Sequence, residues 1–311
     1  MTRLFLVGAW FLGFTVTAVA QLPQPPNFGE PIPNTLPYSG SEIFRFNLHL
    51  KKVKPLKIAE EAFDTPRTSF IVILGDNSRL RELEPLRLKN YLQQGGAILI
   101  STNKAPGWVN GGNWDNVFGV SVSGRHLTAA PHDCYQGGPN RPLVKPTQLN
   151  DRFGSAAQLF KGVPPNGAEA IAANRPSELS LFAADHFNFT WTLLASYPNT
   201  VRYLNEFGAP NANNANFAYA ARTRDESGRM LIVADQSTFA NGMMGFKPLA
   251  DDDFEFDNGN FEFTNRTIDW LKGGHAQPRT SCLFISDGRV IDQFATETPK
   301  DQPPPPMPLP E

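Results

Sequence analysis

The sequence predicts an α/β protein with a mostly parallel sheet, and two segments of the chain carry the prediction. Residues 69–103 read as a strand, helix, strand unit, because the continuous apolar runs 70–74 and 97–100 flank a helical pattern. A second unit places the apolar run 229–234 before a helix around residues 261–271. Alternating buried strands and helices are typical of parallel sheets with helical crossovers.

Caps and turn residues place the remaining early elements. Ser39-Gly40-Ser41 can cap a short helix through residues 43–48, and residues 55–58 are expected to form the first strand. The helix between the two buried strands should occupy residues 80–92. It ends before Gly95-Gly96, a glycine pair of the kind that terminates helices.

A long loop insertion is expected around residues 105–190, where Gly, Pro and Asn are frequent. Inside it, only residues 114–122 have enough apolar character for a short helix and strand. Further strands are expected at residues 190–195, 217–221 and 282–285. The strand 217–221 should pair with 229–234 across a short turn as an antiparallel edge hairpin.

The first twenty residues predict export. Arg3 gives a positive start, Leu4 to Val19 is almost wholly apolar, and Ala18-Val19-Ala20 matches the small-residue cleavage pattern. Residues 1–20 are therefore expected to be a signal peptide that is cleaved after Ala20, giving a periplasmic or extracellular protein. The alternative is an uncleaved N-terminal membrane anchor, although this segment is near the short limit for crossing a bilayer.

Composition divides the rest of the chain into three parts. Residues 21–40 form a Pro-rich extended lead-in, residues 41–295 a single α/β domain, and residues 296–311 a Pro-rich disordered tail. The chain after residue 20 has no comparable apolar stretch, so no integral membrane span is expected after cleavage.

Charge and cysteine content exclude several classes of protein. Lys and Arg total 28 against 30 for Asp and Glu, so there is no basic surplus of the kind that drives nucleic-acid binding. Only Cys134 and Cys282 are present, which makes them one disulfide candidate and excludes a cysteine-rich scaffold. Whether their sulfur atoms meet is left open by the sequence.

Polar residues directly after the predicted strands are the candidate ligand-binding residues, because ligands of open α/β sheets gather at the carboxyl ends of strands. The candidates are Asp76, Asn77, Ser101, Asn103, Asp235, Ser237 and Asn241. The alternative is that these residue types act as helix caps and turn formers. On that interpretation Asp235, and Asn265 in the last helix, bind buried backbone, and replacing either by Ala should lower thermal stability.

Three other constellations give weaker signals. His126, His132 and Cys134 are competent zinc ligands, but no fourth ligand stands at a standard spacing. The acidic run 251–258 resembles calcium-loop composition without the EF-hand spacing. A serine hydrolase using Ser237 and Asp235 with His186 or His275 lacks the Gly-x-Ser-x-Gly sequence around the serine. No cofactor, no metal and no catalytic residue is therefore assigned.

Residues 86–100 (LRLKNYLQQGGAILI) and 228–271, which include Asp235 to Asn241 (DQSTFAN) and Asn265 to Leu271 (NRTIDWL), resemble the family of domain of unknown function 4350. That family is similar to gliding-type (GldG) accessory domains and to class I glutamine amidotransferases. The resemblance implies a flavodoxin-like three-layer sandwich. It also implies a missing catalytic cysteine, because Ser101-Thr102-Asn103 stands where the amidotransferase nucleophile would be.

The sequence as a whole favours a non-catalytic, exported α/β module that binds a protein partner or a polar polymer. An accessory subunit of a cell-envelope assembly would fit this description. The alternative is an exported hydrolase using Ser237 and Asp235 with a loop histidine.

Overall fold

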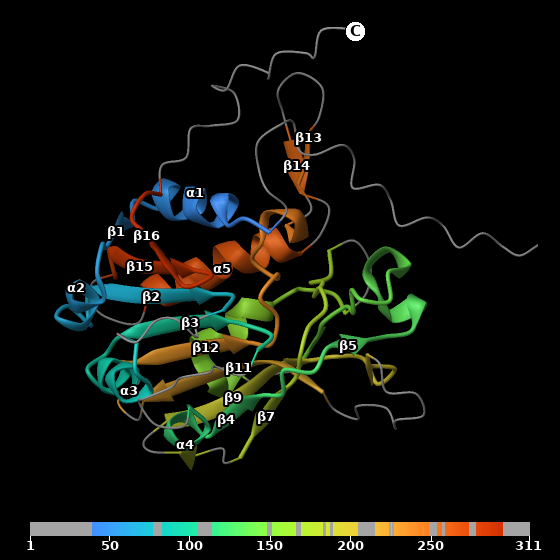
Figure 1. The fold of residues 1–311 in the computed structure, drawn as a ribbon, viewed down its shortest axis with the longest axis horizontal. Coiled ribbons are helices and arrows are strands. Elements are labelled where there is room, and N and C mark those ends of the chain that lie inside the picture. Colours follow the sequence, from blue (N-terminus) through green and yellow to red (C-terminus); the bar gives the residue numbers. More distant parts are fainter. Residues whose placement is uncertain are drawn as a thin grey trace, which may run out of the picture.

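The computed structural model of the protein describes residues 39–76, 83–104, 114–147, 151–165, 169–182, 185–186, 189–204, 215–223, 225, 227–244, 246–248, 254–256, 259–273 and 278–294. The expected signal peptide, most of the Pro-rich lead-in, Asn77, the side chains of the acidic run 251–258 and the tail 296–311 lie outside the described residues. The strands of the described ranges form one twelve-stranded mixed sheet and two small two-stranded sheets (Figure 1).

The α-helices are α1 (Glu42–Leu50), α2 (Ala59–Phe63), α3 (Pro85–Gln93), α4 (Trp114–Phe118) and α5 (Asn260–Lys272), and the 3₁₀ helices are η2 (Pro131–Asp133), η3 (Tyr135–Gly137), η4 (Asp151–Phe160) and η5 (Asn241–Met243). The strands of the main sheet are β1 (Lys54–Pro55), β2 (Ser69–Leu74), β3 (Ala97–Ser101), β4 (Val120–Val122), β6 (Lys145–Pro146), β7 (Leu179–Leu181), β8 (Asp185–His186), β9 (Phe189–Ser196), β11 (Asn216–Thr223), β12 (Arg229–Val233), β15 (Ser281–Ser286) and β16 (Arg289–Ile291). The small sheets pair β5 (Leu127–Thr128) with β10 (Arg202–Tyr203) and β13 (Phe246–Pro248) with β14 (Phe254–Phe256).

The main sheet has a parallel part in the order β1-β15-β2-β3-β12 and continues through antiparallel strands. The predicted α/β class with parallel strands is confirmed, and so is the β11–β12 hairpin. The antiparallel part is larger than one edge hairpin, because β11 also pairs with β9 along its length and β7 and β4 extend the sheet further. The predicted last strand, β15, lies inside the sheet between β1 and β2.

Helices cover both faces of the parallel strands, α1 and α5 on one face and α3 and α4 on the other (Figure 1). Successive side chains along a strand point to opposite faces of the sheet and therefore enter different cores. Phe70, Val72 and Leu74 of β2 pack in the core beneath α1 and α5, whereas Ile71 and Ile73 pack in the core beneath α3. Because burying one such side chain contributes about 1.5–3 kcal/mol, these strands fix the centre of the molecule.

A first strand is present where it was expected, but the predicted extent of residues 55–58 is wrong. β1 ends at Pro55, Ile58 is half exposed, and a short helix, α2, begins at Ala59. The Glu61 carboxylate accepts the Lys57 backbone N–H at 2.9 Å, which satisfies a donor just before the helix.

Arg279 is fully buried and forms hydrogen bonds with the loops at the amino ends of the strands. Arg279 donates to the carbonyl oxygens of Gly95 at 2.6 Å, Ser227 at 2.9 Å and Leu271 at 2.9 Å, and also to that of Gly273. Burial lowers the pKa of its guanidinium to about 10. These bonds connect the end of α5 to the turns before β3 and β12.

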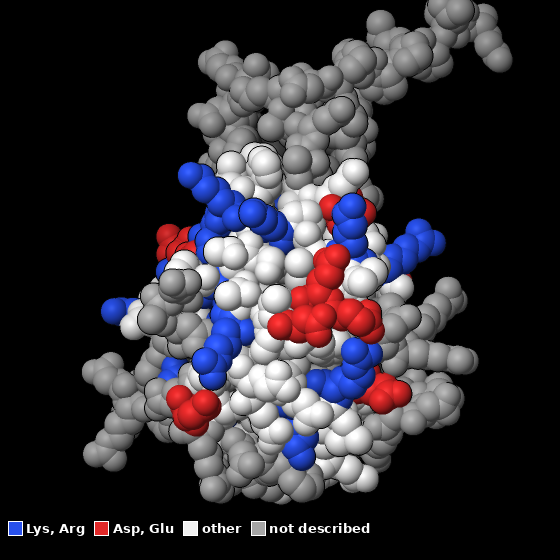
Figure 2. Space-filling model, turned by 90° about the vertical axis from the view of Figure 1, so that its left-hand side faces the viewer, with Lys and Arg blue, Asp and Glu red and all other residues white. Residues whose placement is uncertain are grey.

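The surface near α2 carries acidic and basic side chains interspersed on one face (Figure 2). This face therefore has no extended area of one charge sign among its described residues, in keeping with the nearly balanced charge of the chain. No helix within the described ranges is both long and apolar enough to span a bilayer.

Candidate functional site

The carboxyl ends of the parallel strands meet at one edge of the sheet. Leu74 at the end of β2 is in register with Ser101 of β3 and with Ser286 of β15, and Ser101 is in register with Val233 of β12. The segments that follow these strands are therefore neighbours in space. This edge holds six of the seven candidate residues predicted from the sequence, and Asn77 lies outside the described residues.

Asp235, directly after β12, is fully buried and hydrogen-bonded by protein donors. Its Oδ1 accepts the Ser237 backbone N–H at 2.9 Å, and its Oδ2 accepts the Asn174 N–H at 3.0 Å and the Thr238 hydroxyl at 2.8 Å. Burial raises the pKa of this carboxyl to about 6, although the three hydrogen bonds act in the opposite direction. The side chain thus joins the turn 235–238 to the loop at Asn174, and each of its oxygens accepts a hydrogen bond from the protein.

Ser101 and Asn103 also contact the protein itself. The Ser101 hydroxyl, at the end of β3, donates to the Asp235 carbonyl oxygen. Asn103 Nδ2 donates to the Arg175 carbonyl oxygen at 3.5 Å, while its Oδ1 is buried without a partner in the described part of the chain. Both residues hold the loops at this edge together.

Asn241 and Asp76 bind neighbouring elements. Asn241 is fully buried, its Oδ1 accepts the Ile43 N–H at 3.0 Å, and its Nδ2 donates to Glu42 Oε2 at 2.5 Å, so it fixes the start of α1. Asp76 Oδ2 forms a partly exposed ion pair with Lys104 Nζ at 3.2 Å. Exposed pairs of this kind stabilise a fold by about 1 kcal/mol or less.

Ser237 is the candidate that lines a cavity. This cavity has a volume of about 50 Å³ and lies between the start of α1, the end of β2, the segment after β12 and the turn after β15. Its lining residues are Ser39, Gly40, Ser41, Leu74, Gly75, Gln236, Ser237, Phe239, Ala240, Ser286 and Asp287. We call it the strand-end cavity.

Sequence reasoning missed Asp287 and Ser41 as members of this site. Asp287 stands just after the predicted strand 282–285 in the sequence, but only the position of β15 beside β2 brings it next to Gly75. Gly75 has φ +80°, and a β-carbon there would collide with the Asp287 carboxylate. The glycine therefore permits both the turn and the close approach of Asp287.

The arrangement required for a serine hydrolase is not formed by the described residues. No described histidine contacts Ser237, and the oxygens of Asp235 are bonded to the donors given above. The ring of His126 contacts the Arg175 carbonyl oxygen through Nδ1 at 2.9 Å. The side chain of His186 and all of His275 lie outside the described residues.

Neither cysteine forms the disulfide considered from the sequence. Cys134, between η2 and η3, and Cys282, in β15, are both buried free thiols. Burial raises the pKa of the Cys134 thiol to about 11 and that of Cys282 well above its ordinary value, so both are weak nucleophiles. Within the described residues no three His, Cys, Asp or Glu side chains converge in a way that could hold a metal ion.

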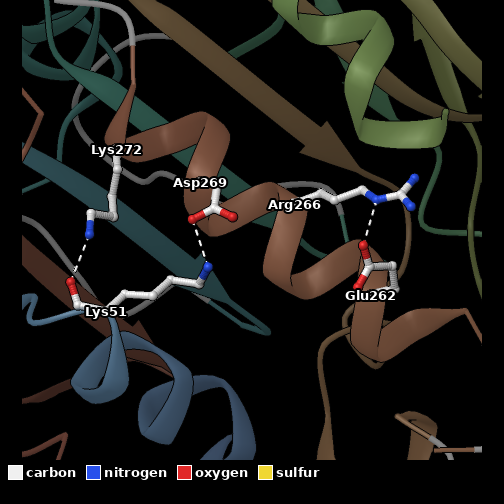
Figure 3. A network of polar contacts seen from close by, with 5 residues as sticks. All are labelled: Lys51, Glu262, Arg266, Asp269 and Lys272. Atoms are coloured by element: carbon white, nitrogen blue, oxygen red, sulfur yellow. Dashed lines mark hydrogen bonds and ion pairs between the residues drawn. The ribbon is translucent and has the colours of Figure 1, made fainter.

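A larger concavity, with a volume of about 440 Å³, lies between α1 and α5. It is lined by Asn47, Leu50, Lys51, Phe261, Glu262, Asn265, Arg266 and Asp269. Its charged groups pair with one another: Lys51 Nζ lies 2.6 Å from Asp269 Oδ1, and Arg266 Nε lies 2.9 Å from Glu262 Oε1 (Figure 3). Because the charges compensate each other, the groove does not select a ligand by charge.

Asn265 lies in this groove, and the expectation that it binds buried backbone is wrong. It is partly exposed, whereas Asn260, at the start of α5, is fully buried. Asn260 Oδ1 accepts the Ala172 N–H at 2.8 Å, and its Nδ2 donates to the carbonyl oxygens of Ala172 at 2.8 Å and Thr238 at 3.0 Å. Asn260, five residues earlier in α5, therefore makes the backbone contacts that were expected of Asn265.

Comparisons with known proteins give limited likenesses. No protein-family model matches the chain, and no curated protein matches it. Among solved structures, one described as the mmIFT52 N-terminal domain aligns at 12% identity over 71% of this chain and 82% of that chain, with a TM-score of 0.47. A cold-adapted β-galactosidase from Rahnella sp. R3 aligns at 14% identity over 65% of this chain and 23% of that chain, with a TM-score of 0.30. At these TM-scores we base no functional argument on either likeness.

Proposed function

We propose that this protein is a non-catalytic, exported α/β binding module that serves as an accessory subunit of a cell-envelope assembly and recognises a protein partner. The proposal includes the domain of unknown function 4350 resemblance and a flavodoxin-like, class I glutamine amidotransferase-like arrangement without the nucleophilic cysteine. Parallel strands with helices on both faces support this arrangement.

The observation that carries the proposal is the bonding of Asp235. A hydrolase built on Ser237 needs a base and an acid that orients the base. Both carboxylate oxygens of Asp235 accept hydrogen bonds from the residues around them. In a hydrolase this carboxylate would have to orient the catalytic histidine, but here it holds the surrounding loops in place. The 50 Å³ strand-end cavity is also too small for a sugar ring or a dipeptide substrate.

Ser237→Ala gives a clean test, because the Ser237 hydroxyl makes no hydrogen bond with described residues and its loss should leave the fold intact. The mature chain and this variant would be assayed against panels of esters, amides and glycosides, with circular dichroism as the folding control. We expect no turnover by either protein. Turnover by the native chain that disappears in Ser237→Ala would establish the hydrolase instead.

The binding half of the proposal needs a separate measurement. The tagged mature chain, isolated from envelope fractions of the native host, should co-purify with one protein at fixed stoichiometry by quantitative mass spectrometry. A chain that stays monomeric and unaccompanied under gentle cross-linking would contradict it.

A further inference from the structure

The strand-end cavity has one charged group in its lining, the carboxylate of Asp287. Within the described part of the chain Asp287 forms no ion pair, and its Oδ1 receives only a long contact of 3.4 Å from the Asp76 N–H. It differs in this respect from Asp76, which is paired with Lys104, and from Asp235, whose oxygens accept three hydrogen bonds. Asp287 is itself exposed, so the cavity opens beside an accessible carboxylate that has no counter-ion among the described residues.

Residues whose hydroxyl groups have free hydrogen-bonding capacity line the same cavity as this carboxylate. Ser41 is only 7% exposed, and its side chain does not cap α1 even though it stands at the N-cap position. The hydroxyls of Ser41, Ser237 and Ser286 make no hydrogen bond with described residues. Hydroxyl oxygens and a carboxylate are acceptors for a group that carries several N–H donors.

The remaining lining is apolar. Leu74, Phe239 and Ala240 are almost completely buried and face the same space. A volume of about 50 Å³ holds a few water-sized groups, which matches an ammonium group with the adjoining methylenes. A lysine side chain has this composition, an apolar stem with a compact cation at its end.

We propose that the strand-end cavity receives the ammonium group of a lysine side chain from a partner protein. The inference rests on the proposed function, a partner-binding module, and names the chemical group that the module recognises. The ammonium group would lie against the Asp287 carboxylate and donate to the serine hydroxyls, while the stem packs on Leu74 and Ala240. The binding of an anion is disfavoured. The helix dipole places about half a positive charge at the N-terminus of α1, and the Glu42 carboxylate in the first turn already offsets it. The full negative charge of Asp287 therefore dominates at the cavity.

The test uses Nα-acetyl-lysine N-methylamide as the probe and titrates it into the isotopically labelled mature protein by two-dimensional NMR. We expect the amide resonances of Gly75, Ser237 and Asp287 to shift, with a Kd on the order of 1 mM or weaker for a single side chain. The norleucine analogue has the stem without the ammonium group and should leave these resonances unchanged. Equal shifts with both probes, or none with either, would overturn the proposal.

Asp287→Asn is the decisive variant. Asn tolerates the positive φ of 47° at this turn and keeps an acceptor for the Asp76 N–H, so the fold should survive while the charge is lost. Lysine-probe binding should weaken by roughly tenfold or more. Asp64→Asn, at an exposed position after α2, is the matched control and should bind like the native chain.

Two further probes distinguish other ligands. If methylammonium binds as tightly as the lysine probe, the ligand is a free small amine, and the proposal of a lysine side chain from a partner is overturned. If inorganic phosphate shifts the same resonances, the argument that the cavity prefers a cation is refuted. Failure of the probe leaves the accessory function standing, whereas turnover lost in Ser237→Ala would refute that function whatever the probe does.

Discussion

Replacing Asp235 by Asn should change the pH dependence of stability. The folded-state pKa of about 6 lies above the ordinary value of 3.8, so between these values the folded protein holds a proton that the unfolded chain has lost. The stabilisation by this proton is complete below pH 3.8 and disappears as the pH rises through 6. At about 1.4 kcal/mol per unit of pKa difference, this proton contributes at most about 3 kcal/mol to the free energy of unfolding. About 2 kcal/mol of this contribution is lost between pH 4 and pH 7.

Asn cannot ionise, and its side chain has one acceptor oxygen, whereas the carboxyl group of Asp235 has two oxygens that can accept whether or not it is protonated. Of the two backbone donors that Asp235 satisfies, Ser237 N–H and Asn174 N–H, one should lose its acceptor at any pH, at a cost of about 1–3 kcal/mol. The variant is therefore expected to be less stable than the native chain at pH 4. The difference in the free energy of unfolding between the native chain and the variant should become smaller by about 2 kcal/mol at pH 7, because only the native chain then buries a charge.

Urea unfolding followed by circular dichroism at pH 4, 5, 6 and 7 measures both free energies. Asp64→Asn removes an exposed carboxylate and should follow the native curve throughout. If the native chain and Asp235→Asn give parallel stability curves across this range, Asp235 does not change its protonation state as argued, and the reasoning from burial fails.

Two further predictions concern buried hydrogen bonds. Asn260→Ala should lower the free energy of unfolding by about 1–3 kcal/mol, because it leaves the Ala172 N–H and carbonyl group without partners, whereas Asn265→Ala on the same helix should change it by less than about 0.5 kcal/mol. Thermal melts of the pair measure this, and equal shifts would contradict the assignment. Arg279→Met should cost on the order of 3 kcal/mol in urea unfolding, since four carbonyl groups lose a charged donor, and the exposed control Arg67→Met should be neutral. An Arg279→Met variant as stable as that control would show that the buried guanidinium is dispensable.

Local sequence patterns predicted the elements that are buried on both faces. β2, β3 and β12 are continuous apolar runs, and a run of this kind leaves few alternatives in an α/β chain. Pairing between distant segments could not be predicted in the same way. Ser281–Ser286 reads as a short final strand, and nothing local indicates that it enters between β1 and β2.

The same limit applies to the two asparagines of α5. Asn260 and Asn265 both occur in a helix with a buried face, and the sequence does not show which of them meets a backbone segment. The partner of Asn260 is Ala172, whose approach depends on a loop 88 residues earlier in the chain. An expectation based on helix position alone therefore chose the wrong asparagine.

Polar residues after parallel strands have two possible roles, and their hydrogen bonds distinguish them. Asp235 and Asp287 both follow a buried strand and come to the same edge of the sheet. Asp235 accepts three hydrogen bonds from its surroundings, so its carboxylate holds loops together. Among the described residues Asp287 accepts one long contact and lines a cavity whose serine hydroxyls make no hydrogen bond, so its charge is still available. A buried carboxylate that already accepts three hydrogen bonds is out of reach of a ligand, whereas an exposed carboxylate beside a cavity is accessible, and for that reason we place the site of recognition at Asp287 and not at Asp235.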